Sequence, residues 1–166
     1  MTFPNGEARR MTTGPSADIS KAVIEVFAPK FLQKPGVITL SESGNKVVAR
    51  DDELAKAIGL TIPADKSLPD IVLVDLGPAH PLLIFVEVVH TDGPVNDARK
   101  TALLQIAEGA GFAPQHVAFV TAYLDRVQTA VDGRTRLLPP LVLARMIQSL
   151  EPVAGQKALA VGGAGY

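Results

Sequence analysis

The 166-residue chain contains no cysteine, no tryptophan, two tyrosines and three histidines. A chain without cysteine forms no disulfide bond and no thiolate metal site, and three scattered histidines argue against a zinc centre. No apolar run approaches the length of a membrane span, and the N-terminal residues lack the charged and apolar regions of a signal peptide. We therefore expect a cytoplasmic protein in which oxygen atoms hold any bound metal.

The chain is nearly neutral and has an ordinary composition. Its formal net charge is −1, with 47% hydrophobic and 20% charged residues. These values, with the length, are typical of one soluble globular domain that has a substantial core. A neutral chain carries no global signal for or against nucleic acid, so DNA binding would rest on local basic residues and on acids neutralised by metal.

The most informative stretch is residues 68–89, which predicts a β-hairpin. Residues 71–74 and 82–89 are dense in β-branched and aliphatic side chains, and glycine and proline are concentrated between them. Paired residues in an antiparallel hairpin have a constant sum of residue numbers. A loop centred near Pro78 therefore places Asp70 opposite Glu87, with both acids at the same end of the hairpin.

Two acids in this arrangement need a positive partner. Like charges directly across a ladder are destabilising, and an acid buried in an apolar strand is costly unless it is paired. A cation between Asp70 and Glu87 is the simplest solution. Magnesium prefers one or two carboxylates together with water and a substrate phosphate, so this pair indicates metal-assisted phosphodiester hydrolysis, with a lysine or arginine nearby to stabilise the transition state.

An amphipathic helix is expected near the N-terminus. Residues 18–27 carry apolar side chains at helical spacing, with Asp18 or Ser16 as the N-terminal cap and Pro29 as the stop. The preceding residues 1–17 are polar and rich in threonine, glycine and proline, and we expect them to form a flexible lead.

Further strands and helices are expected on both sides of the central hairpin. Residues 37–40 and 46–49 predict a second strand pair, and Asp51 can cap a short helix that ends at Gly59. After the hairpin, Asn96 can cap a helix that runs to about residue 110, whose expected inward residues are Ala98, Ala102, Leu103, Ile106 and Ala107.

The chain after this helix completes the expected sheet. Residues 117–122 predict a strand that is parallel to strand 82–89, because a helix connects the two, and the expected fold is therefore α/β, a mixed sheet flanked by helices. Residues 137–150 have helical character interrupted by two prolines, and we expect no ordered structure in the last seven residues. We predict a folded domain at residues 18–125 and a divergent C-terminal segment at 126–166.

Four short segments carry a family resemblance, and in chain order they are Ser43-Gly44-Asn45-Lys46, Leu68-Pro69-Asp70-Ile71-Val72-Leu73, Phe85-Val86-Glu87-Val88-Val89, and Asp92-Gly93-Pro94-Val95 followed by Arg99. Pro69-Asp70 followed by an acid in an apolar strand resembles the PD-(D/E)XK nuclease superfamily. The four segments in this order resemble more specifically the catalytic domain of type II restriction endonucleases of the BsuBI/PstI type. The resemblance covers residues 19–125 and implies a restriction-endonuclease-like fold and a magnesium-dependent endonuclease acting on double-stranded DNA.

The resemblance also implies roles for individual residues. Asp70 and Glu87 would be the metal ligands, and the main-chain carbonyl of Val88 would complete the set. The third signature position holds Val89 where the superfamily has lysine, so the catalytic cation must come from another position. The first candidate is Lys46, after the Gly-Asn turn, and the others are Arg99 and Lys100. Cleavage of both strands at a palindromic site would favour a two-fold homodimer.

Two alternatives remain open from the residues alone. An inactive or truncated DNA-binding relative of the same fold would keep both acids. An ordinary α/β ligand-binding domain would instead hold a phosphate at the helix after Gly93-Pro94. The sequence lacks the Gly-x-Gly-x-x-Gly fingerprint of such domains, and that reading leaves the two carboxylates unexplained.

Overall fold

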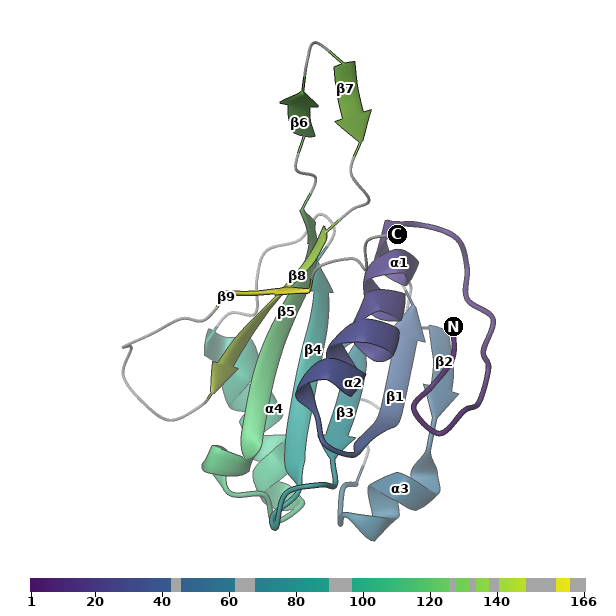
Figure 1. Cartoon of the computed structure of the whole chain (residues 1–166). Helices are drawn as coiled ribbons and strands as arrows, with labels where there is room; N and C mark the ends of the chain where they lie inside the picture. Colours follow the sequence, from purple (N-terminus) through teal and green to yellow (C-terminus); the bar gives the residue numbers. More distant parts are fainter. Residues whose placement is uncertain are drawn as a thin grey trace.

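The structure is a computed structural model. It describes residues 1–42, 46–61, 68–89, 97–125, 128–131, 134–137, 141–148 and 158–161. Seven strands form one mixed sheet in the order β2-β1-β3-β4-β5-β8-β9, with helices on both faces (Figure 1). The strands of this sheet are β1 Pro35–Glu42, β2 Lys46–Arg50, β3 Ile71–Asp75, β4 Leu82–Val89, β5 Val117–Asp125, β8 Leu141–Gln148 and β9 Ala158–Val161. A separate hairpin is formed by β6 Gln128–Val131 and β7 Arg134–Leu137.

The central hairpin has the predicted register. Strands β3 and β4 are antiparallel, and their pairs run from Ile71 opposite Val86 to Asp75 opposite Leu82. All five residues of β3 are buried, because the strand lies between β1 and β4 and is covered on both faces. The same register, continued by one step, places Asp70 opposite Glu87.

Each face of the sheet has its own hydrophobic core. The α1 core lies under the N-terminal helical segment and includes Ile19, Val23, Phe27, Ile71, Leu73, Ile84, Val86, Ala118, Val120 and Ala122. The α4 core lies under helix α4 (Asp97–Gly109) and includes Val72, Val74, Leu83, Phe85, Leu103, Ala107, Val117 and Phe119. Alternate residues of each central strand therefore belong to opposite faces, as the period of a β-strand requires.

The N-terminal helical segment is longer than predicted and differs at both ends. It consists of α1 (Pro15–Ala22), the π-helical turn η1 (Val23–Phe27) and α2 (Ala28–Phe31). Gly14 is the N-cap and makes no side-chain capping bond, so the predicted caps Ser16 and Asp18 are wrong. Pro29 does not end the helix, because the π-turn widens the backbone before the proline, and the Ala28 N–H bonds five residues back to the Val23 carbonyl.

The first residues, for which we expected a flexible lead, pack on the sheet in this structure. Phe3 is buried in the α1 core, and a bridge pairs Thr2 with Ala8. The Thr12 N–H and hydroxyl both donate to the carboxylate of Glu42 on β1, at 2.8 and 3.0 Å. These contacts tie the lead to the α1 side of the sheet.

Two predicted elements beside the hairpin are confirmed. Strands β1 and β2 form the second antiparallel pair. The short helix α3 (Asp52–Ala57) follows Asp51, whose carboxylate accepts a hydrogen bond from the Leu54 N–H at 2.8 Å. Gly59 follows the helix with a φ of 76°, a conformation that glycine adopts without strain.

Helix α4 and strand β5 confirm the predicted parallel unit, since β5 pairs with β4 in parallel. Leu103 and Ala107 are buried as predicted, but Ala98 and Ala102 are exposed, so the inward face was partly wrong. The predicted cap Asn96 lies outside the described residues. No helix in the described part of the chain has the length and apolarity needed to cross a membrane.

The predicted helical character of residues 137–150 is wrong. Residues 141–148 form strand β8, which pairs antiparallel with β5, and Ala158–Val161 form β9, which pairs with β8. A short apolar run does not distinguish a helix from a strand by periodicity, and here the open edge of β5 decides the outcome. Two of the residues for which we expected no ordered structure, Ala160 and Val161, belong to β9.

Asp75 fixes the other end of the hairpin through three backbone hydrogen bonds. Its carboxylate accepts from the N–H groups of Gln33, Lys34 and Gly77 at 2.9, 2.8 and 3.0 Å, and the residue is 3% exposed. Burial alone raises the pKa of this carboxyl, but the bonds from Lys34, Gln33 and Gly77 outweigh it and hold the pKa below its usual value.

We expect Asp75→Ala to destabilise the protein by about 3 kcal/mol at neutral pH, or about 10 °C in Tm, because three backbone donors lose a charged acceptor. The folded-state pKa of Asp75 lies below its unfolded value, so this contribution is present above the unfolded pKa and is lost as pH falls through the folded pKa. Thermal melts from pH 7 to pH 2 should therefore converge for the two proteins. The exposed Asp52→Asn is the control, and a constant Tm difference across this range would contradict the assignment.

Candidate active site

Asp70 and Glu87 lie at one end of the central hairpin and on the same face of the sheet. Val72 and Val74, the alternate residues after Asp70, belong to the α4 core, as do Leu83 and Phe85, the alternate residues before Glu87. The period of the strands therefore places both carboxylates on the α4 face, beyond the apolar core.

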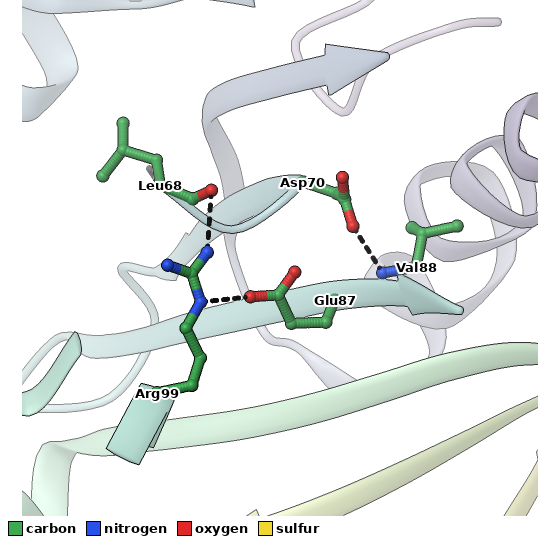
Figure 2. Close-up of polar contacts among 5 residues, drawn as sticks. All are labelled: Leu68, Asp70, Glu87, Val88 and Arg99. Atoms are coloured by element: carbon green, nitrogen blue, oxygen red, sulfur yellow. Dashed lines mark hydrogen bonds and ion pairs between the residues drawn. The ribbon is translucent and has the colours of Figure 1, made fainter. Parts of the chain in front are cut away.

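The backbone of neighbouring strands holds Asp70 in place. One carboxylate oxygen, Oδ2, accepts a hydrogen bond from the Val88 N–H at 2.8 Å (Figure 2). The Asp70 carbonyl accepts a second bond from the Ser41 N–H at 2.7 Å. Asp70 is thus attached to β4 by its side chain and to β1 by its main chain.

Glu87 is held by an arginine from helix α4. Its Oε1 accepts from Arg99 Nε at 2.9 Å, and another guanidinium nitrogen of Arg99 donates to the Leu68 carbonyl at 3.0 Å (Figure 2). The side chains of Arg99 and Glu87 are 26% and 19% exposed. Because the helix follows β4 along the chain, Arg99 reaches back over the end of that strand and links it to the residue that precedes Pro69.

The surroundings of Glu87 disfavour its ionised form. Burial raises the pKa of Glu87, the hydrogen bond and charge of Arg99 lower it, and the neighbouring Asp70 carboxylate raises it again, with a raised pKa as the net result. One arginine therefore does not fully compensate two acids that face each other in a partly dry site. A bound divalent cation would lower this pKa and stabilise the ionised pair.

The donor set fits magnesium. Among the described residues, no group of three or more His, Cys, Asp or Glu side chains gathers that could form a closed cage. Two carboxylates supply only part of an octahedral shell, which leaves positions for water and a phosphate oxygen, as magnesium prefers. Asp70, Glu87 and the Val88 carbonyl are the groups that would hold the ion.

The three candidate cations, Lys46, Arg99 and Lys100, have different surroundings in the structure. Arg99 contacts Glu87 directly, whereas Lys100 pairs with Asp97 on its own helix at 3.4 Å. Lys46 is the first residue of β2, where its backbone pairs with Glu42, and β1 separates β2 from β3. The backbone of Lys46 is thus about 10 Å from β3, two strand spacings. The Lys46 side chain and the predicted segment Asp92–Val95 lie outside the described residues.

Sequence reasoning missed the main-chain contacts of the site. The Leu68 carbonyl as an acceptor for Arg99 and the Val88 N–H as a donor to Asp70 have no side-chain signal. The register of the hairpin could have indicated the bond from the Val88 N–H to Asp70, because it places Asp70 within one residue of Val88 across the strands.

Comparison with known proteins identifies the relatives of this chain. Residues 1–135 match the BsuBI/PstI restriction endonuclease domain, a range that extends beyond both ends of the predicted 18–125 domain. The chain is 29% identical over 121 residues to the type II restriction enzyme BsuBI of Bacillus subtilis, which covers 73% of this chain and 37% of BsuBI.

A solved structure shows the same fold. The SdaI restriction endonuclease superposes with a TM-score of 0.55 and 23% sequence identity, over 68% of this chain and 34% of SdaI. The predicted mixed sheet flanked by helices is therefore confirmed. This chain spans about a third of the length of these relatives. Because the family match extends over most of its length, the chain belongs to the BsuBI/PstI restriction endonuclease domain family.

Proposed function

We propose that this chain is a magnesium-dependent nuclease domain that hydrolyses phosphodiester bonds of double-stranded DNA. The observation that carries the proposal is the opposed pair Asp70 and Glu87, fixed on one face of the sheet by Val88 and Arg99. Family membership supports the same chemistry. An ordinary ligand-binding domain is not favoured, because it explains neither the pair nor the family match.

Each residue has a proposed role. Asp70, Glu87 and the Val88 carbonyl hold the ion, which when bound neutralises charge on the phosphate and lowers the pKa of a water molecule. Arg99 orients Glu87. It also supplies the positive charge that the superfamily has at the position of Val89, either from its present position or by turning towards the phosphate. Lys46 stays a predicted second source of that charge.

The direct test is a plasmid assay. The purified chain should convert supercoiled DNA to nicked or linear forms in Mg²⁺ and leave it intact in EDTA, with Asp70→Asn purified in parallel to exclude a contaminating nuclease. Cleavage of both strands requires two sites, which a homodimer would supply, so linear product at low conversion would support a dimer. An inactive relative of the same fold would leave the plasmid supercoiled under both conditions.

The metal site should also appear in protein stability, independently of catalysis. In EDTA we expect Asp70→Asn to melt about 1 to 3 °C above the wild type, because it removes one of two facing charges and keeps an oxygen to accept from the Val88 N–H. Saturating Mn²⁺ at about a hundred times its Kd should raise the Tm of the wild type by about 5 to 10 °C and that of the variant far less.

The raised pKa of Glu87 gives this experiment a pH dependence. A carboxyl whose folded-state pKa lies above its unfolded value contributes stability below the unfolded pKa and loses it as pH rises through the folded pKa. The metal-free wild type should therefore lose stability over that range, while Mn²⁺ stabilises it more as Glu87 ionises. A lower Tm for Asp70→Asn in EDTA together with a full Mn²⁺ response would remove the basis for the site.

A further inference from the structure

Thr121 on β5 continues the row of polar residues that contains the two acids. In the parallel pairing of β4 with β5, Glu87 is opposite Thr121. The row therefore runs Asp70, Glu87, Thr121 across three neighbouring strands, at the same end of the sheet. Neighbouring strands are about 4.8 Å apart, so one substrate group can contact more than one member of the row.

The side chain of Thr121 belongs to the same face as the acids. Along β5, Val117 and Phe119 belong to the α4 core. The residues that alternate with them belong to the α1 core, and they are Ala118, Val120 and Ala122. Thr121 is thus the point at which the α4 face of β5 changes from apolar to polar, level with Glu87.

The hydroxyl of Thr121 has no partner within the described part of the chain. The residue is 8% exposed, and no hydrogen bond of its side chain occurs among the described residues. Thr121 is thus mostly buried, but its hydroxyl is not among the fully buried side-chain atoms without a partner in the described part of the chain, so it can still contact water or a ligand. Thr39 also carries a partnerless hydroxyl, but it is sealed in the core. Thr121 differs because it is beside a carboxylate that is 19% exposed.

The chemistry of the row indicates what this hydroxyl would bind. Ionised Asp70 and Glu87 accept hydrogen bonds and repel a phosphate, whereas a threonine hydroxyl can donate one. One oxygen of Glu87 already accepts a hydrogen bond from Arg99, and another charged neighbour of Glu87 is Asp70. A phosphate oxygen held at the acids would therefore find Thr121 as a neutral donor on the β5 side.

We propose that Thr121 is a substrate-positioning residue, whose hydroxyl donates a hydrogen bond to a phosphate oxygen of the DNA bound at Asp70 and Glu87. The proposal rests on the nuclease function proposed above and adds a contact from a third strand to it. Arg99 and Thr121 then contact the site from different elements, the first from helix α4 and the second from strand β5.

The test compares Thr121→Val, which removes the hydroxyl at nearly constant volume, with Thr121→Ser, which keeps it. We expect Thr121→Val to lower kcat/KM about tenfold to a hundredfold, the effect of losing one hydrogen bond to a charged group, and Thr121→Ser to stay within about threefold of the wild type. Thr39→Val is the matched control, because it makes the same change at a sealed position on the same sheet and should leave cleavage unchanged.

A binding readout separates this proposal from the nuclease function. With Ca²⁺ in place of Mg²⁺, fluorescence anisotropy should show about tenfold weaker binding of a labelled DNA duplex to Thr121→Val, while its Mn²⁺-induced shift in Tm stays that of the wild type. Wild-type kcat/KM and affinity in Thr121→Val, or equal defects in Thr121→Ser and Thr121→Val, would overturn the role of Thr121 and leave the nuclease function standing. A wild-type chain that neither binds nor cleaves DNA in any divalent metal would overturn both.

Discussion

Asp70→Asn and Glu87→Gln should each lower magnesium-dependent plasmid cleavage by about a thousandfold or more. Each substitution removes a charge that the metal needs, and the stabilisation of transition-state charge by a bound metal is worth several kcal/mol, which corresponds to several factors of ten in rate. Both variants should keep the far-UV circular dichroism of the wild type, because the amide side chains retain an oxygen at each position. Initial rates of supercoiled-plasmid loss, measured at several Mg²⁺ concentrations, provide the comparison.

The control for this experiment is another carboxylate near the site. Asp97 begins helix α4, two residues before Arg99, and its side chain is fully exposed. Asp97→Asn should leave the cleavage rate within about twofold of the wild type, because a surface ion pair of this kind contributes little. Full activity in either Asp70→Asn or Glu87→Gln would exclude the pair as the metal site.

The central hairpin could be predicted in detail because local features specify it. Two strands of limited length, apolar except for Glu87 and the terminal Asp75, are joined by a segment rich in glycine and proline. A shift of one residue would have moved Asp70 and Glu87 to opposite faces. The observed pairing of Ile71 with Val86 follows from these constraints. The position of the two acids at one end of the hairpin could be predicted for the same reason, since both belong to it.

The parallel pairing of β4 with β5 could be predicted from the helix between them, but other contacts between distant segments could not. Strand β8 is a strand because β5 offers an unpaired edge, and the local sequence of residues 141–148 does not contain that information. Pro29 was read as a helix stop because a π-turn has no recognised sequence signal. The same limit applies to the proposed catalytic cation. Lys46 and Arg99 were both compatible with the pattern, and only the packing of α4 against the hairpin brings Arg99 to Glu87.

Arg99→Ala should lower the cleavage rate by about a hundredfold or more, the usual effect of losing one preorganised electrostatic contact at a transition state. Arg99 is the cation that the structure places on Glu87, and Val89 leaves the signature lysine position without charge. Lys100→Ala, which alters the next residue of the same helix, should stay within a few-fold of the wild type, because Lys100 pairs with the exposed Asp97. Lys46→Ala measures the contribution of the other predicted cation in the same assay.

The pH dependence of Arg99→Ala distinguishes an electrostatic role from a purely structural one. Arg99 lowers the pKa of Glu87, against burial and against the Asp70 charge. Its removal should therefore raise that pKa further and move the acid limb of the pH–rate profile to higher pH, whereas a packing defect would lower the rate at every pH without moving the limb. Arg99→Lys should reverse part of this shift, because lysine returns the positive charge without the second bond to the Leu68 carbonyl. An unshifted pH–rate profile in Arg99→Ala, together with a hundredfold lower cleavage rate in Lys46→Ala, would assign the catalytic charge to Lys46. Arg99 would then have only a structural role, connecting helix α4 to the hairpin.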